Sequence, residues 1–115
     1  MEFHELLRMV NMEEILKGVI IMIKQQRGSC MVFTPTRLHK ILGLPPKIPC
    51  LLSVTAYYLD VLREKGLLRL YSYNQKGGRS KKYIITRESP LWRIAKEYPL
   101  EEAVRVAKVM IDEEK

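Results

Sequence analysis

The spacing of apolar residues changes from helical to alternating at Gly66, and this change constrains the fold more than any other feature of the sequence. Before Gly66, apolar residues recur at intervals of three and four, which is typical of helices packed on a core. After it, residues 68–73 alternate in character and residues 83–86 form a second β-prone run, which predicts two paired strands. Gly77 and Gly78 lie between the two runs and permit the positive φ angles of a hairpin turn. We therefore predict an α+β fold, mostly helical, with one β-hairpin.

Capping residues and prolines divide the rest of the chain. Asn11 has the spacing of a helix N-cap, and Thr34-Pro35 predicts the start of a short helix that ends near Gly43. The prolines within residues 44–49 predict an extended connection, and Pro90 predicts a further break. The predicted helices are residues 3–10, 12–27, 35–43, 52–65 and 99–114, with a brief strand at residues 30–33.

A length of 115 residues fits one domain, here a core unit of about residues 12–87 flanked by two terminal helices. The longest apolar run, Val19–Ile23, is far shorter than the ~20 residues that a membrane span needs. The start of the chain carries Glu2 and Glu5 and has no apolar signal region. We therefore expect a soluble, cytoplasmic protein with no membrane partner.

The positive charge is concentrated in the middle of the chain. The net charge is +7, from 20 Lys and Arg residues against 13 Asp and Glu residues. Residues 34–87 hold eleven basic and only two acidic residues, so the whole excess lies there. A positive field confined to one part of a small domain attracts a polyanion, of which nucleic acid is the commonest. A solvated basic surface that serves only solubility is the alternative explanation.

The segment that precedes the predicted hairpin, residues 53–68, resembles the third helix of winged-helix DNA-binding domains. Its Leu-x-x-Leu-x-x-x-Gly-Leu spacing recurs in that family where the recognition helix ends and the wing begins. The basic loop from Lys76 to Lys82 stands where the tip of the wing would be. The resemblance covers about residues 12–87 and points to the small prokaryotic or archaeal transcriptional regulators of the family. The residues that form the spacing are Leu59, Leu62, Gly66 and Leu67.

The resemblance implies a winged helix-turn-helix, with a three-helix core, a β-hairpin wing and additional N- and C-terminal helices, that binds double-stranded DNA. A helix in the major groove reads base edges with the outward side chains near its N-terminus. On the third helix, the predicted DNA-binding residues are Ser53, Ala56, Tyr57, Asp60 and Arg63. In the wing they are Lys76, Gly77, Gly78, Arg79, Lys81 and Lys82, and the predicted backbone contacts of the second helix are Arg37 and Lys40.

Each of these sites has a plain structural alternative. Tyr57 can be a tyrosine on a partly exposed helix face, and the wing loop can be a solvated hairpin tip. Solvation accounts equally well for Arg37 and Lys40. The third helix also lacks the Arg, Asn and Gln side chains that make bidentate base contacts, so its sequence-specific readout is only weakly indicated. The wing is the sharper indication, because a phosphate backbone would relieve the repulsion among its crowded cations.

No set of residues indicates catalysis, a cofactor, a metal site or a small-molecule effector site. His4 and His39 have no partners at ligand spacing, so we expect surface or helix-face histidines. Cys30 and Cys50 are expected to be buried free thiols, with a disulfide as the alternative. We therefore predict a binding protein and not an enzyme.

The two terminal helices carry more apolar residues than a surface helix needs, which favours an interface between two copies of the chain. Winged-helix proteins of this size commonly dimerise through such helices, so the resemblance also implies a homodimer. The alternative is that the two helices pack on each other within one chain. The predicted interface residues are Leu7, Val10, Val106 and Met110.

The leading hypothesis is a homodimeric transcriptional regulator that reads duplex DNA with its third helix and a basic wing. Two further hypotheses stay open: a winged-helix interaction module in a larger assembly, and a non-specific chromatin or RNA-binding protein. An interaction module has no need of four basic residues in the wing. A non-specific binder would keep the basic wing and show little preference between sequences.

Overall fold

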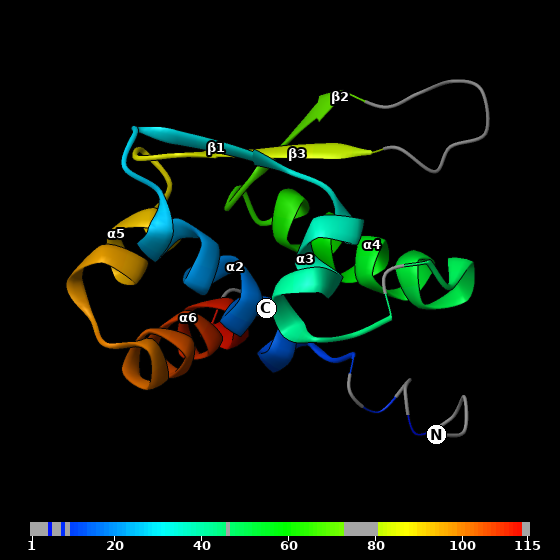
Figure 1. Ribbon diagram of the computed structural model, residues 1–115. Helices are drawn as coiled ribbons and strands as arrows, with labels where there is room; N and C mark the ends of the chain where they lie inside the picture. Colours follow the sequence, from blue (N-terminus) through cyan, green and yellow to red (C-terminus); the bar gives the residue numbers. More distant parts are fainter. Residues whose placement is uncertain (1–4, 6–7, 9, 46, 73–80, 114–115) are drawn as a thin grey trace.

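The computed structural model describes residues 5, 8, 10–45, 47–72 and 81–113. In this part of the chain it contains five helices and a three-stranded antiparallel sheet, and the α+β class is confirmed (Figure 1). The elements, in chain order, are α2 (Met12–Gln25), β1 (Cys30–Phe33), α3 (Pro35–Leu42), α4 (Pro49–Glu64), β2 (Arg69–Ser72), β3 (Lys82–Thr86), α5 (Pro90–Glu97) and α6 (Leu100–Glu113).

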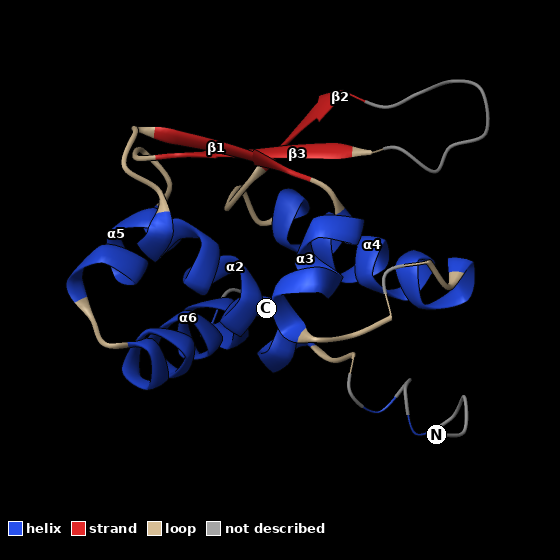
Figure 2. Ribbon diagram, viewed as in Figure 1, coloured by secondary structure: helices blue, strands red, loops and turns tan. Residues whose placement is uncertain are grey.

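The sheet lies along one side of the helices, and its strands follow the order β1-β3-β2 (Figure 2). The register places Cys30 opposite Thr86 and Phe33 opposite Tyr83. Alternate residues of β1 and β3 are buried against the helices, as the pleat of a half-buried sheet requires. The predicted strand at residues 30–33 and the predicted pairing of the two later strands are therefore confirmed.

The central helix α2 is the core helix that its apolar spacing predicted. The Asn11 side chain caps it by accepting a hydrogen bond from the Glu14 backbone N–H at 2.9 Å. Seven of its residues are buried, among them Ile15, Leu16 and Ile23. The helix ends at Gln25, two residues before the expected end, because Gln26 has an extended backbone.

Capping residues and prolines determine where helices α3 and α4 begin and where α3 ends. Thr34 caps α3 by accepting from the Arg37 N–H at 3.2 Å, and Gly43 ends it with a positive φ of 74°. Helix α4 begins at Pro49, three residues earlier than expected. A proline is compatible with the first turn of a helix, where its missing N–H would have no partner within the helix, so the extended connection is shorter than predicted.

Helix α5 was not expected from the sequence. Pro90 does not break the chain but opens this helix, with Ser89 as the N-cap accepting from the Leu91 N–H at 3.2 Å. The Ser89 hydroxyl also donates to the Leu67 carbonyl at 2.6 Å, which ties the helix to the segment after α4. Trp92 and three neighbouring apolar side chains are buried, so the hydrophobic core continues beyond residue 87.

Helix α6 matches the predicted C-terminal helix to within one residue at each end. It packs on α2 and α5 of its own chain, and Ala103, Ala107 and Ile111 belong to the hydrophobic core. Five of the eight residues of the predicted N-terminal helix over residues 3–10 lie outside the described residues. Of the helices that the structure describes, none has both the length and the apolar character needed to cross a bilayer.

Candidate nucleic-acid interface

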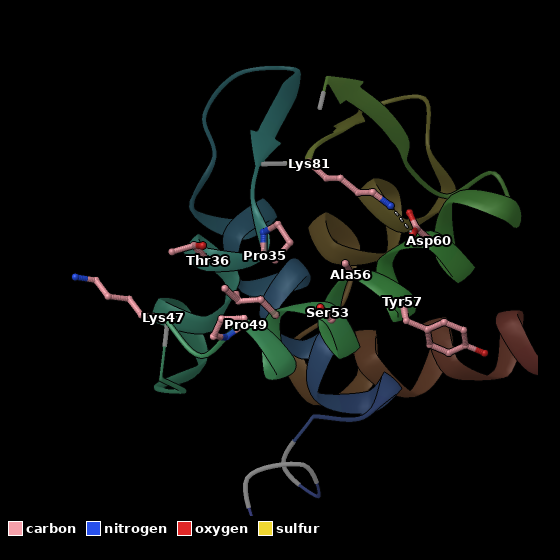
Figure 3. A pocket seen from close by; sticks show the side chains of 10 residues that line it. Pro35, Thr36, Lys47, Pro49, Ser53, Ala56, Tyr57, Asp60 and Lys81 are labelled. Atoms are coloured by element: carbon pink, nitrogen blue, oxygen red, sulfur yellow. Dashed lines mark hydrogen bonds and ion pairs between the residues drawn. The ribbon is translucent and has the colours of Figure 1, made fainter. Parts of the chain in front are cut away.

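The outward face of α4 forms the floor of a hollow of about 600 Å³. The start of α3 and the connection before α4 border the hollow on one side, and the residue before β3 borders it on the other (Figure 3). Three hydroxyl groups, two lysines and one carboxylate lie among small or apolar side chains at its surface. The lining residues are Pro35, Thr36, Lys47, Pro49, Leu52, Ser53, Ala56, Tyr57, Asp60 and Lys81.

Four of the five residues predicted for the recognition helix, Ser53, Ala56, Tyr57 and Asp60, line this hollow. Tyr57 is 65% exposed and projects outward from α4, with its ring edge-on to Tyr58 at a centroid distance of 5.6 Å (Figure 3). Such an exposed ring offers both an apolar face and a hydroxyl to a partner. The structure thus places these four residues on one outward face of α4, as their helical spacing predicts.

Asp60 also contacts the rest of its own chain. Its Oδ2 accepts a hydrogen bond from Lys81 Nζ at 3.1 Å, and its Oδ1 accepts one from the Tyr83 hydroxyl at 3.0 Å. Arg63 Nε lies 3.6 Å from the same Oδ1. The sequence predicted Asp60, Arg63 and Lys81 as separate DNA contacts, whereas the structure brings them together. Both carboxylate oxygens of Asp60 are occupied, so in this conformation the side chain joins α4 to the start of β3.

The hydroxyl of Tyr83 is held in its protonated form. Burial raises the pKa of Tyr83 well above its ordinary value of 10.0, and the hydrogen bond to Asp60 raises it further. The ring is fully buried and lies 6.0 Å from that of Phe33. The donor to Asp60 is therefore fixed to the core of the protein.

This raised pKa predicts a loss of stability at high pH. The unfolded chain releases the Tyr83 proton near pH 10, whereas the folded chain retains it, so the free energy of unfolding falls as the pH rises above 10. Tyr83→Phe has no proton to lose and is expected to show a shallower decline. Urea unfolding of both proteins at pH 9 and pH 11 measures the difference. Equal declines would show that Tyr83 does not contribute to the pH dependence.

The predicted wing is described only in part. Lys76, Gly77, Gly78 and Arg79 lie outside the described residues. Lys82, at the start of β3, is exposed, and the paired strands β2 and β3 form the base of the predicted hairpin.

The predicted contacts of the second helix are not among the residues that line the hollow. Arg37 and Lys40 are exposed on α3, while Thr36 of the same helix lines the hollow. Lys47 was not predicted and also lines the hollow, from the connection before α4. The sequence signal for Lys47 was a cation shortly before the candidate recognition helix, two residues before Pro49.

His39 joins α3 to α4. It is fully buried, and its Nδ1 donates to the Pro45 carbonyl at 2.9 Å, since a carbonyl can only accept. Its Nε2 is hydrogen bonded to the Thr55 hydroxyl of α4. His39 lies on a helix face, as expected, but that face is buried. Among the described residues, no cluster of three potential metal ligands occurs.

The two cysteines differ from the expectation of buried thiols. Cys30 and Cys50 are both free, and both are exposed. Cys30 is the first residue of β1, where the strand emerges from a turn, and Cys50 lies in the first turn of α4.

The predicted dimer residues lie in different environments. Val10 is 3% exposed and belongs to the core of its own chain, so it is not available to a partner. Val106 and Met110 are half-buried on α6, and their neighbour Val109 is 50% exposed. Leu7 lies outside the described residues. The inner face of α6 packs on α2 and α5 of its own chain, and Val106 and Met110 pack partly against the core, whereas Val109 stays exposed.

Searches with the chain against protein-family models, curated proteins and solved structures found no match.

Proposed function

We propose that the chain is a winged helix-turn-helix protein that binds double-stranded DNA and regulates transcription. The order helix, strand, helix, helix, strand, strand and the sheet order β1-β3-β2 support this proposal. In it, α3 and α4 are the helix-turn-helix, α4 is the recognition helix, and β2 and β3 carry the wing. His39 holds the two helices at a fixed angle through its bonds to the Pro45 carbonyl and Thr55.

The observation that carries the proposal is the hollow on the outward face of α4. Three hydroxyl side chains, those of Thr36, Ser53 and Tyr57, border it and can donate hydrogen bonds to phosphate oxygens or base edges. Lys47 and Lys81 stand at its margins. Since proteins contact DNA mostly through cations and hydroxyls at the phosphates, this is the chemistry of a DNA-binding face.

The charge around α4 favours a polyanion over a neutral protein partner. Arg37, Lys40, Lys47 and Lys82 are exposed on α3, before α4 and at the start of β3, and the whole net excess of positive charge lies within residues 34–87. A surface for a neutral protein gains nothing from such an excess, whereas duplex DNA releases counterions when cations bind its phosphates.

A homodimer through α6 belongs to this proposal. Val109 is exposed on α6, and Val106 and Met110, which are half-buried at the edge of the core, lie next to it at helical spacing. Lys65 Nζ, at the end of α4, donates to the Ile111 carbonyl of α6 at 3.3 Å. A dimer through α6 would therefore also fix the separation of the two recognition helices, which must lie ~34 Å apart to reach successive turns of one DNA face.

A sequence-tolerant nucleic-acid binder is the second candidate. The outward positions of α4 offer Ser53, Ala56 and Tyr57, which cannot make the bidentate contacts that distinguish bases most strongly.

A mobility-shift assay with a pool of random duplexes at two salt concentrations, followed by sequencing of the bound fraction, tests both candidates. We expect binding that weakens as salt rises and a bound pool enriched in a common motif. Salt-dependent binding without enrichment would favour the sequence-tolerant binder. No binding to any duplex at low salt would contradict the proposed function.

A further inference from the structure

We infer that Asp60 determines specificity: by holding Lys81 and Tyr83 it sets the base of the wing against α4 and limits the attraction of α4 for an arbitrary phosphate backbone. The inference rests on the proposed function and deepens it. Asp60 is a positioning residue here, because it acts through Lys81 and the β3 segment and makes no direct DNA contact.

The geometry ties two distant parts of the chain to one carboxylate. Lys81 and Tyr83 are 21 and 23 residues from Asp60 in sequence. Each donates to a different carboxylate oxygen, and Arg63 Nε approaches Oδ1 as well. A carboxylate held from two directions cannot rotate freely, so its orientation relative to β3 is defined.

One of the two donors is anchored in the core. The ring of Tyr83 is fully buried beside that of Phe33, so its hydroxyl cannot follow a movement of the surface. Asp60 is thereby fixed to β3, and Lys81 is held by Asp60 at the point where the chain enters the strand. In the proposed wing, Lys81 directly precedes β3, so this end of the wing is set relative to α4.

The carboxylate also places a negative charge where the proposed ligand is negative. Asp60 and Glu64 are the two acidic residues within residues 34–87, and Asp60 is the one that lines the hollow. Its side chain is 25% exposed. A DNA phosphate that binds Lys81 must share it with Asp60. This lowers the affinity for every DNA duplex that does not gain compensating contacts elsewhere. Such a repulsive element is a recognised source of specificity.

Two variants of α4 separate this role from a simple effect of net charge. Asp60→Asn removes the charge and keeps the shape and an oxygen that can accept from Tyr83. Glu64→Gln removes the same charge four residues further along α4, at an exposed position outside the hollow. Circular dichroism and urea unfolding establish that both variants fold.

The measurement is the ratio of affinities for a selected duplex and for a random duplex, together with the salt dependence of each. For Asp60→Asn we expect tighter binding to random duplex. We expect the ratio of affinities for selected and random duplex to fall on the order of tenfold, which is the effect of losing one interaction between coupled residues. Its log–log salt slope should steepen by about 0.9 as Lys81 becomes free for a phosphate. Glu64→Gln should leave both the ratio and the slope near the wild-type values.

The outcomes are distinct. Equal effects of the two variants on both duplexes would overturn the inference and leave the proposed function intact. A wild-type protein that binds duplex without preference would overturn it as well, since Asp60 would have no specificity to determine. Absence of duplex binding in the wild type would remove the proposed function and the inference together. If Asp60→Asn does not fold, Tyr83→Phe removes the hydrogen bond between Tyr83 and Asp60 instead. This variant is also expected to lower the ratio of affinities for selected and random duplex. An unchanged ratio would reject the inference.

Discussion

Changing Arg79, Lys81 and Lys82 together to alanine is expected to weaken binding to every duplex, on the order of a hundredfold at physiological salt. Each phosphate contact that is lost lowers the log–log salt slope by about 0.9. Lys82 is exposed, whereas Lys81 is shared with Asp60, so the slope should fall by more than one contact and by less than three. Fluorescence anisotropy with labelled duplex at four or more salt concentrations measures both quantities.

A matched triple variant distinguishes the contribution of the wing to DNA binding from that of the net charge of the protein. Lys17 on α2, Arg27 after α2 and Arg93 on α5 are exposed basic residues that do not line the hollow on α4. Their change to alanine removes the same three charges and is expected to alter the slope little. If the two triple variants weaken binding equally, the effect belongs to the overall charge of the protein and the wing is not part of the interface.

Val109→Glu is expected to convert a homodimer to a monomer and to lower the affinity for a duplex with two half-sites by about a hundredfold or more. Val109 is 50% exposed, so a charge there does not disturb the core of the chain, but it would be buried without a partner in an interface between two α6 helices. Sedimentation should show a species near twice the chain mass of 13.5 kDa for the wild type and the chain mass for the variant.

The control for this variant is Gln25→Glu, which adds one negative charge at an exposed position at the end of α2. It should sediment like the wild type. A wild-type protein that sediments as a monomer at micromolar concentration and still binds duplex tightly would reject the dimer, and α6 would then serve only its own chain.

The boundaries of most elements could be predicted because single residues determine them locally. Asn11 and Thr34 accept the backbone N–H bonds expected of N-caps, and Gly43 adopts the positive φ that ends α3. The same local chemistry is present at α5, where Ser89 and Pro90 form a capped start. A proline marks the first turn of a helix as readily as a break, and only the apolar spacing after Pro90 distinguishes the two.

The contacts of the candidate site could be predicted only in part. Helical spacing is enough to place Ser53, Ala56 and Tyr57 on one face of α4. It cannot show that Lys81 and Tyr83 reach back to Asp60, because that contact depends on how β3 packs against α4. The bond between His39 and Thr55 depends in the same way on the packing of α3 against α4. Periodicity predicts which way a side chain faces, and tertiary packing decides what it meets.

The two exposed cysteines provide the most direct test of the proposed DNA-binding face. Cys50 lies in the first turn of α4, seven residues and two helical turns before Tyr57, and so on the same side of the helix. Cys30 begins β1 and pairs with Thr86, at the end of the sheet away from the connection between β2 and β3. One thiol therefore reports on the proposed interface and the other serves as an internal control.

The measurement is the rate at which a bulky maleimide alkylates each thiol, followed by mass spectrometry of the separate peptides, with and without saturating duplex. If DNA binds across α4, the alkylation of Cys50 should slow in proportion to the fraction of protein bound, while Cys30 should react at its original rate. Protection of Cys30 with Cys50 unprotected would place the DNA on another face and contradict the assignment of α4 as the recognition helix.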